Sequence, residues 1–287
     1  MATEQGTLYV IATPIGNLAD FSLRAIETLK TVDVICAEDT RHARTLLQHY
    51  GITTHCIALH QHNEEHAATG LIEKIKSGTS MAIISDAGTP LISDPGMPLV
   101  ALAQAEGIHV SPVPGACALI AALSASGLPV THFSFLGFLP RTSSSRQTLF
   151  KEQFNHATYT WVFYESCHRI EACLEDLACV LPADHEIAIA REITKLHETI
   201  IKSSIEKILT LVKEDSNMRR GEFVVMVTGR VIEKKPDTLN DHQLKTLSLL
   251  LEECSIKTAV HLAVEITGAR KKLLYQTALQ LSENNQS

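Results

Sequence analysis

The sequence predicts an α/β fold, with two successive α/β domains followed by a small helical module. Short apolar runs alternate with helical patterns along most of the chain, which is typical of βαβ units. Loops rich in glycine and proline recur where the predicted strands end, and three amphipathic helical patterns come last. The length of 287 residues suits two domains, and the hydrophobic fraction of 45% is enough to fill their cores.

The first block, residues 1–116, is predicted to form a mainly parallel sheet flanked by helices. Strands are expected at residues 7–12, 32–37, 56–59, 81–85 and 109–113. Helices are expected at residues 22–30, 41–50, 64–77 and 98–107. Pro98 suits the first turn of its helix, and Gly107 suits the position just past the end.

The second block, residues 117–232, is predicted to be a separate α/β domain with more antiparallel character. A helix at 116–125 precedes a strand at 133–138, and a polar loop at 141–146 leads into the next helix. Further strands are expected at residues 159–164, 186–190 and 222–227, with an edge strand at 197–202. Further helices are expected at residues 169–180 and 204–214.

The last part of the sequence is predicted to be a helical module joined by a linker. Residues 233–240 are polar and contain Pro236, which indicates a linker. Beyond it, residues 241–253, 257–266 and 271–282 have amphipathic helical patterns, with Gly268 at one turn. The module is therefore expected to span residues 241–287.

Composition narrows the class of protein. A net charge of −7 argues against coating naked nucleic acid by bulk attraction, so an RNA substrate would need recognition by shape or presentation in a particle. The seven cysteines form no CxxC pair and indicate buried thiols in a reducing compartment. The polar start and short first apolar run predict neither a signal sequence nor a membrane span, so we expect a cytoplasmic protein.

Dense loops at strand ends predict a ligand site in the first block. They lie at residues 13–17, 85–90, 93–96 and 112–115. In open α/β sheets ligands bind outside the carboxyl ends of the strands, and glycine there lets the backbone approach a ligand closely. Neither GxGxxG nor a GxxxxGK[ST] loop occurs, which disfavours an NAD-linked Rossmann enzyme and a P-loop NTPase.

Charged clusters at strand ends leave alternatives open. Asp39 is placed to cap the helix after the second strand, but capping leaves Arg41 and His42 unexplained, which favours substrate contact. Residues 163–169 and 190–198 combine acids with bases, either as solvated turns or as parts of a cleft. The turn at 219–222 is predicted to be a solvated hairpin whose Gly221 could approach a ligand.

One further loop invites a metal interpretation. Residues 60–66 contain three histidines, but their spacing matches no zinc signature and no cysteine lies nearby. This polar loop is expected to cap the following helix, and no metal site is predicted.

Several segments together carry a resemblance to a known family. They are TPIGNLAD (13–20), AEDTR (37–41), SDAGTPLISDPG (85–96), PVPGA (112–116), SASGLP (124–129), GFLP (137–140), FYES followed by HR (163–169), and ARE with TK and HE (190–198). Over nearly the whole chain this set resembles the ribosomal RNA small subunit methyltransferase I family of the tetrapyrrole-methylase superfamily. Each segment is weak alone, whereas SDAGTPLISDPG with AEDTR is specific. Cys167 departs from the family, which usually has proline there.

The resemblance implies a fold, an activity and a set of ligands. It implies a homodimer that holds S-adenosylmethionine between its two α/β domains and methylates the ribose 2′-hydroxyl of cytidine 1402 in 16S rRNA, within the 30S subunit. The last helices would be a helix-turn-helix-like module whose basic residues 270–272 suit RNA phosphates. The implied cofactor contacts are Asp86, Gly88, Leu91, Ile92, Ala116, Cys117, Phe163, Tyr164, Ala190, Arg191, Gly221 and Glu222.

Catalytic roles follow from position and residue type. A ribose hydroxyl is a weak nucleophile, so a base should help, and Asp39 and Glu165 are the candidates. Lys195 could stabilise the developing alkoxide. The predicted substrate-binding residues, with Arg41 or Arg169 as a phosphate clamp and the 13–17 loop at the cleft, are Pro14, Asn17, Arg41, His42 and Arg169.

Two other functions remain open at this point. A methylase acting on a tetrapyrrole would share the superfamily, but such enzymes typically carry a GxGxGD-like first loop where this chain has TPIGNLAD. A non-catalytic ribosome-binding protein could retain the fold, although the acid-rich strand-end loops argue against binding alone.

Overall fold

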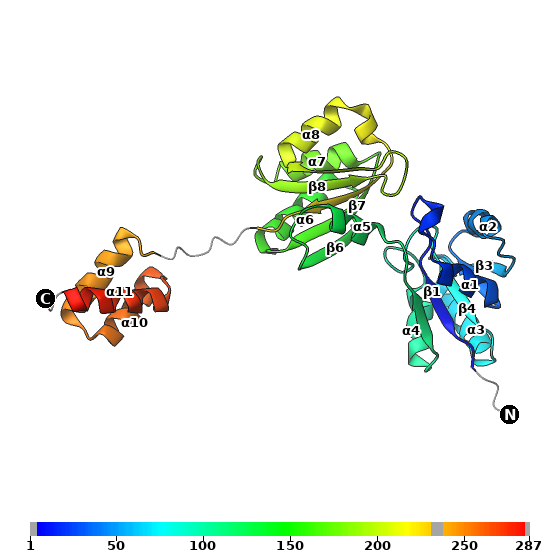
Figure 1. The fold of residues 1–287 in the computed structure, drawn as a ribbon, viewed down its shortest axis with the longest axis horizontal. Helices are drawn as coiled ribbons and strands as arrows, with labels where there is room; N and C mark the ends of the chain where they lie inside the picture. The colour runs from blue at the N-terminus through cyan, green and yellow to red at the C-terminus, as the bar shows by residue number, and fades with distance from the viewer. Residues whose placement is uncertain (1–4, 231–237, 285–287) are drawn as a thin grey trace. The chain divides into compact units, whose positions relative to one another are not determined.

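The computed structural model describes residues 5–230 and 238–284, which form two compact units divided after Arg230 (Figure 1). Both predicted α/β blocks belong to the first unit, and the helical module is the second. Of the predicted linker, residues 233–237 lie outside the described residues. No helix in the described part of the chain is both long and apolar enough to cross a membrane.

The first sheet is wholly parallel and has the strand order β3-β2-β4-β1-β5. Its strands are β1 (Leu8–Ile11), β2 (Val34–Ala37), β3 (His55–Ala58), β4 (Met81–Ile84) and β5 (Val110–Val113). Its helices are the 3-10 helix η1 (Leu18–Asp20), α1 (Leu23–Thr31), α2 (Thr40–His49), α3 (Glu64–Lys76) and α4 (Met97–Ala105). Helices α1 and α2 pack on one face and α3 and α4 on the other, which explains why these strands are apolar on both sides.

The topology of this sheet creates a crevice beside β1 and β4. After β1 the chain crosses one face toward β2, whereas after β4 it crosses the other face toward β5. These neighbouring strands are therefore a switch point, where the loops at their carboxyl ends diverge and leave room for a ligand.

The second sheet is mixed and has the order β6-β7-β10-β8-β9, with β6 and β7 parallel and the other pairs antiparallel. Its strands are β6 (Phe133–Phe138), β7 (Thr160–Ser166), β8 (Glu186–Arg191), β9 (Thr199–Ser204) and β10 (Glu222–Val227). Its helices are α5 (Ala118–Ala125), α6 (Ser143–His156), α7 (Ile170–Ala178), α8 (Ile205–Glu214) and the 3-10 helix η2 (Ser216–Arg219). Helices α6 to α8 cover one face and α5 the other.

Two sequence expectations in this block were wrong. The last four residues of the predicted 141–146 loop are helical, because the Thr142 side chain accepts a hydrogen bond from the Ser145 N–H and starts α6 early. The segment 219–222 is not a hairpin turn, because it joins η2 to β10.

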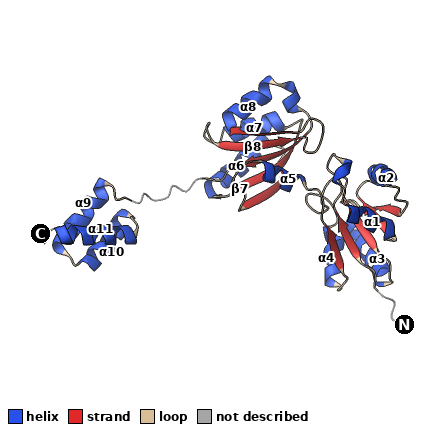
Figure 2. Cartoon of the chain, in the orientation of Figure 1, coloured by secondary structure: helices blue, strands red, loops and turns tan. Residues whose placement is uncertain are grey.

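The second unit is a helical module with its own small core (Figure 2). It consists of α9 (Asp241–Glu253), α10 (Ile256–Thr267) and α11 (Lys271–Asn284). Asn240 and Gln243 form a capping box at the start of α9, and Gly268 ends α10 in the left-handed conformation. Its buried residues include Leu247 and Leu274, so the module folds around apolar contacts of its own.

Candidate active site

A cavity of about 420 Å³ lies at the carboxyl ends of the first sheet's strands, and both sheets contribute to its wall. This volume is in the usual range for small-molecule sites. Its polar and titratable lining residues include Glu38, Asp86, Thr89, Asp94, Cys117, Tyr164, Lys195 and Glu222. Its apolar lining residues include Ile15, Ile92, Phe138, Ile193 and Val224.

The loop after β4 forms one wall, and neighbouring backbone holds it in place. Gly88 and Thr13 exchange two backbone hydrogen bonds of 2.9 and 3.1 Å, which tie this loop to the one after β1. The Thr89 hydroxyl donates to the Ala116 carbonyl at 3.1 Å. These bonds therefore fix the loops after β1, β4 and β5 to one another where they border the cavity.

Backbone strain is concentrated in two loops at this cavity. Among the described residues, the non-glycine residues with positive φ are Leu91, Ser93, Glu192 and Thr194, at 71°, 71°, 52° and 68°. Such conformations cost about 1–3 kcal/mol each and persist only where the surroundings impose them. The first pair lies in the loop after β4 and the second in the loop after β8, so both cavity walls hold strained backbone.

Three carboxylates gather in the cavity wall of the first sheet. Burial, followed by the charges of Asp94 and Asp86, raises the pKa of Glu38. Burial also raises the pKa of Asp94, and the charge of Asp86 raises it further. A hydrogen bond from Ser85 lowers this pKa but does not cancel the rise. The wall therefore favours a cation, and Glu38 and Asp94 are better proton acceptors than ordinary carboxylates.

Asp39 lies beside these acids but outside the cavity lining. Arg41 donates to both of its oxygens through Nε and Nη2, at 3.2 and 2.8 Å, and the same carboxylate caps α2. Those hydrogen bonds hold the pKa of Asp39 well below its usual range. Asp39 is therefore a poor proton acceptor, and Arg41, with 89% of its side chain exposed, faces solvent.

Lys195 is held at the cavity by two carboxylates. Its Nζ donates to Glu192 Oε1 at 2.8 Å and to Glu222 Oε2 at 2.7 Å. Burial alone would lower the pKa of Lys195, but the hydrogen bonds that it donates to these two carboxylates outweigh that effect and raise the pKa. Lys195 therefore remains a cation beside the cavity and can stabilise negative charge.

Tyr164 and the aromatic rings around it form part of the opposite wall. The Tyr164 hydroxyl accepts a hydrogen bond from the Leu119 N–H at 3.2 Å, and burial raises the pKa of Tyr164 to about 12. Phe135 and Phe138 pack edge-on against its ring at centroid distances of 4.8 and 5.6 Å. Tyr164 is therefore a neutral, fixed wall residue.

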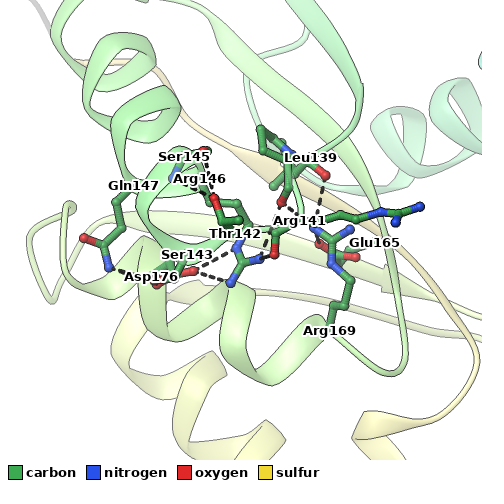
Figure 3. Close-up of polar contacts among 11 residues, drawn as sticks. Leu139, Arg141, Thr142, Ser143, Ser145, Arg146, Gln147, Glu165, Arg169 and Asp176 are labelled. Atoms are coloured by element: carbon green, nitrogen blue, oxygen red, sulfur yellow. Dashed lines mark hydrogen bonds and ion pairs between the residues drawn. The ribbon is translucent and has the colours of Figure 1, made fainter.

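The structure turns the Glu165 side chain away from the cavity, so its position does not support the catalytic role predicted for it. Alternation along β7 directs Phe163 and Glu165 to the face covered by α6 and α7, away from Tyr164 and the cavity. Glu165 borders the cavity as a residue, but its side chain is 1% exposed, contacts Cys173 and pairs with Arg169 at 3.3 Å (Figure 3). Its carboxylate is thus separated from the cavity by the sheet, and Arg169 is engaged with it.

The predicted site residues divide into two groups. Those that line the cavity are Asp86, Gly88, Ile92, Cys117, Tyr164, Glu165, Lys195 and Glu222. Those that do not line it are Pro14, Asn17, Asp39, Arg41, His42, Leu91, Ala116, Phe163, Arg169, Ala190, Arg191 and Gly221. Arg191 instead donates to the carbonyls of Arg220 and His197, and so braces the strained loop after β8.

The lining residues that were not among the predicted site residues include Glu38, Asp94 and Phe138. Glu38 and Asp94 stand in the same acid-rich strand-end loops that indicated a site, so a signal for them was present. Phe138 carried no such signal, because its position at the cavity depends on an irregular strand pairing. Among the described residues, no group of three or more potential ligands is arranged to hold a metal ion.

Comparisons with known proteins first give the class. The model of the family described as Tetrapyrrole (Corrin/Porphyrin) Methylases matches residues 7–209. A uroporphyrin-III-C-methyltransferase from Thermus thermophilus has a similar structure, with 19% identity, a TM-score of 0.51, and coverage of 78% of this chain and 94% of that one. A diphthine synthase is also similar, with 16% identity, a TM-score of 0.59, and coverage of 82% and 92%. The chain therefore has the tetrapyrrole-methylase fold.

Closer relatives then give the family. The ribosomal RNA small subunit methyltransferase I of Escherichia coli is 47% identical over 96% of each chain. That of Pseudomonas aeruginosa is 48% identical over 96% of this chain and 97% of its own. A second family model, the RsmI C-terminal HTH domain, matches residues 237–282. The chain belongs to the ribosomal RNA small subunit methyltransferase I family.

Proposed function

We propose that this protein uses S-adenosylmethionine to methylate the ribose 2′-hydroxyl of cytidine 1402 in 16S rRNA. One observation carries the proposal: a methylase fold with a cavity at its strand ends is joined, in one chain, to a module that matches the RsmI C-terminal HTH domain. Relatives named for ribosomal RNA methylation, which match both parts of the chain, support the RNA substrate.

The cavity suits the proposed cofactor on chemical grounds. Glu38, Asp86 and Asp94 would complement its sulfonium and amino charges, and Ile92 and Ile193 offer apolar surface for adenine. Of the implied contacts, the lining residues would hold it directly, and they are Asp86, Gly88, Ile92, Cys117, Tyr164 and Glu222. Leu91, Ala116, Ala190, Arg191 and Gly221 would support them, whereas the Phe163 side chain packs in the core on the far face of the sheet.

The chain's own residues supply the remaining chemistry. When bound, the cofactor supplies an activated methyl group with a good leaving group. The hydroxyl must lose its proton as the new O–C bond forms, and Glu38 or Asp94, with their raised pKa values, would accept it. Lys195 would stabilise negative charge on the attacking oxygen. Asp39, bound by Arg41, would order the loop rather than act as the base.

Substrate contacts would come from both units of the chain. Asn17 and His42 are exposed at strand ends and would border the entering RNA, whereas Pro14 is buried and would act by fixing the first loop. The basic residues Lys271 and Lys272 begin α11 and would contact RNA phosphate. Because the chain is acidic overall, presentation of the rRNA within the 30S subunit would favour binding. Homodimer formation and a cytoplasmic location complete the proposal.

The test is transfer of a labelled methyl group from S-adenosylmethionine to 30S subunits that lack this modification. We expect transfer to 30S subunits and none to a tetrapyrrole, with the label mapping to the 2′-oxygen of cytidine 1402. Transfer to the tetrapyrrole alone would instead establish a small-molecule methylase. Calorimetry that detected no cofactor binding would favour a non-catalytic ribosome-binding protein.

A further inference from the structure

A bulge in β6 places Phe138 at the cavity. Phe135 pairs with Val162 of β7, but the next pair joins Phe138 to Tyr164, so β6 has one extra residue. Gly137 takes up that residue with a φ of 64°, a conformation that favours glycine. Regular pairing would put Gly137 opposite Tyr164, whereas the bulge turns the Phe138 ring onto the cavity side.

Two arginines fix the loop that follows the bulge (Figure 3). Arg169 Nη2 donates to the carbonyls of Leu139 and Pro140 at 3.1 and 2.8 Å. Arg146 Nη1 donates to the carbonyl of Arg141 at 2.8 Å. The carbonyls of three consecutive residues, 139–141, are thus held by arginine side chains, while the side chains of Phe138 and Arg141 stay exposed.

Each of these arginines forms an ion pair with a buried carboxylate. Arg169 pairs with Glu165 at 3.3 Å, and Arg146 Nε donates to Asp176 at 2.8 Å. Asp176 also accepts from Gln147, and the Glu165 carboxylate accepts from a backbone N–H. Arg146 and Asp176 form a buried, hydrogen-bonded charge pair, and Arg169 forms an ion pair with the buried Glu165. Both arginines therefore have little freedom to rotate, which makes the loop rigid.

The rigid loop presents an aromatic ring and a cation. Phe138 is 62% exposed although it lines the cavity. Arg141 is exposed, its side chain makes no hydrogen bond or ion pair with the described residues, and Figure 3 shows it extending away from Arg146 and Asp176. A ring that can stack on a base and a guanidinium that can bind phosphate are the features that recognise an unpaired nucleotide.

We propose that the loop 138–141 holds the RNA nucleotides at the methylation site, with Phe138 stacking on a base and Arg141 contacting the backbone phosphate. The pairs Arg169–Glu165 and Arg146–Asp176 are positioning residues that act through this loop. The proposal rests on the proposed function, since it requires an RNA substrate. It also gives Glu165 and Arg169 a role that fits their place behind the sheet.

The first test separates RNA from cofactor at Phe138. Phe138→Ala should raise KM for 30S subunits about 10- to 100-fold, the loss expected for one stacking contact, with little change in the Kd for S-adenosylmethionine. Phe138→Tyr should restore KM because it keeps the ring. A weakened cofactor Kd with unchanged KM for 30S subunits would overturn the proposal, because Phe138 would then belong to the cofactor site.

The second test uses the salt dependence of binding at Arg141. Arg141→Ala should weaken binding to 30S subunits and reduce the slope of log K against log salt by about 0.7 to 1. The matched control is Lys207→Ala, which removes one charge from the exposed side of α8 and should leave the slope unchanged. Equal slopes for the two variants would overturn the phosphate contact.

The third test is a double-mutant cycle for the positioning role of Arg169. If Arg169 acts by placing Phe138, then Phe138→Ala should cost much less in the Arg169→Ala background than alone. Arg169→Lys, which keeps a donor and a charge, should recover part of the loss. Additive effects of the two substitutions, in variants that keep the wild-type melting temperature, would overturn the positioning role of Arg169. If Arg169→Ala does not fold, Glu165→Gln is a milder substitution for the same cycle.

These outcomes differ from those that test the proposed function itself. If the wild-type protein transfers no methyl group to 30S subunits, the proposed function fails. Direct binding of the same subunits to the wild-type and Phe138→Ala proteins, without cofactor, still reports on the loop. Equal Kd values in that experiment would overturn the loop proposal on their own.

Discussion

Gly16 and Lys195 pack against each other so closely that no side chain fits at position 16. A Cβ atom added to Gly16 would lie 2.5 Å from Lys195 Cγ. Gly16 belongs to the loop after β1 and Lys195 to the loop after β8, so the contact joins loops of different sheets beside the cavity. The position of the Lys195 ammonium therefore depends on the absence of a side chain in the first loop.

Gly16→Ala should displace Lys195 and strain a backbone whose φ is 152°. We expect a loss of stability of about 1–3 kcal/mol from overpacking and a fall in kcat of about 10²-fold from misplacement of the ammonium. Thermal unfolding and single-turnover rates measure the two effects. Gly70→Ala is the control, since nothing lies within 4 Å of that helical position, and it should be neutral or slightly stabilising. Equal melting temperatures and rates for the two variants would contradict the close contact between Gly16 and Lys195.

Glu38→Gln should lower kcat about 10²- to 10⁴-fold if Glu38 is the base. Because burial and neighbouring acids raise the pKa of Glu38, wild-type activity should fall as the pH drops through that raised value. The Gln variant should lose this dependence. Asp39→Asn, in which the altered group is already bound by Arg41, should change kcat little. A larger loss in Asp39→Asn than in Glu38→Gln would restore Asp39 as the base.

Lys195→Met should lower kcat about 10²- to 10³-fold, since it removes a cation that would stabilise the developing alkoxide. Methionine keeps the length and apolar stem of the side chain, so the packing against Gly16 is preserved. The control is Lys213→Met, which breaks an exposed ion pair between Lys213 of α8 and Glu175 of α7. An unchanged kcat in Lys195→Met would rule out the electrostatic role.

Asp94→Asn should change how stability depends on pH. Burial raises the pKa of Asp94, so the folded chain keeps this proton to a higher pH than the unfolded chain. The free energy of unfolding therefore falls as the pH rises from the usual value of 3.8 through the raised value. The Asn variant lacks this loss and should be more stable than wild type at pH 7 but not below pH about 4.

Asp39→Asn is the opposite control for that experiment. The pKa of Asp39 is lowered in the folded chain by hydrogen bonds from Arg41, so its contribution to stability is present above the unfolded pKa and is lost as the pH falls. This variant should be less stable than wild type at neutral pH. Denaturant titrations over a pH series measure the free energy of unfolding of both variants. A change of the same sign in both variants at neutral pH would contradict the causes assigned to the two pKa shifts.

Asp176→Asn should destabilise the fold strongly. The side chains of Asp176 and Arg146 are 8% and 6% exposed, so the substitution leaves a buried guanidinium without its counter-charge. The expected cost is about 3–5 kcal/mol, measured by chemical denaturation. Glu175→Gln breaks a pair whose side chains are 48% and 45% exposed and should leave the midpoint nearly unchanged. Similar midpoints would show that the buried pair adds no stability.

The strands and the general location of the site followed from local patterns. The strands at 133–138 and 222–227 and the helix at 241–253 have the expected bounds, because apolar runs with strong end signals leave little freedom. The loops at residues 13–17 and 85–90 do converge on one cavity. Parallel strands bring their carboxyl ends together, so strand-end residues could be grouped before any contact was known.

The direction in which side chains point at those strand ends could not be predicted from local sequence patterns. Glu165 was predicted to be a cleft residue, but alternation along β7 directs its carboxylate toward α6 and α7. Phe138 became a cavity residue through one inserted residue at Gly137. A single-residue shift in a strand reverses the face of every side chain beyond it. Gly137 inside the strand is compatible with a bulge, but only the pairing with β7 shows where the shift falls.

The sequence by itself determined the fold class, through the periodicity of its apolar residues, and the loops that form the site, through the spacing of glycine, proline and acidic residues. The family followed from the resemblance of its motifs. Only the tertiary structure decided which charged groups are free to act. Arg41 forms an ion pair with Asp39, and Arg169 forms one with Glu165. Two carboxylates hold Lys195 at the cavity. The reason is that proton affinity and electrostatic effect depend on burial and on the nearest partners, and those partners are distant in the sequence.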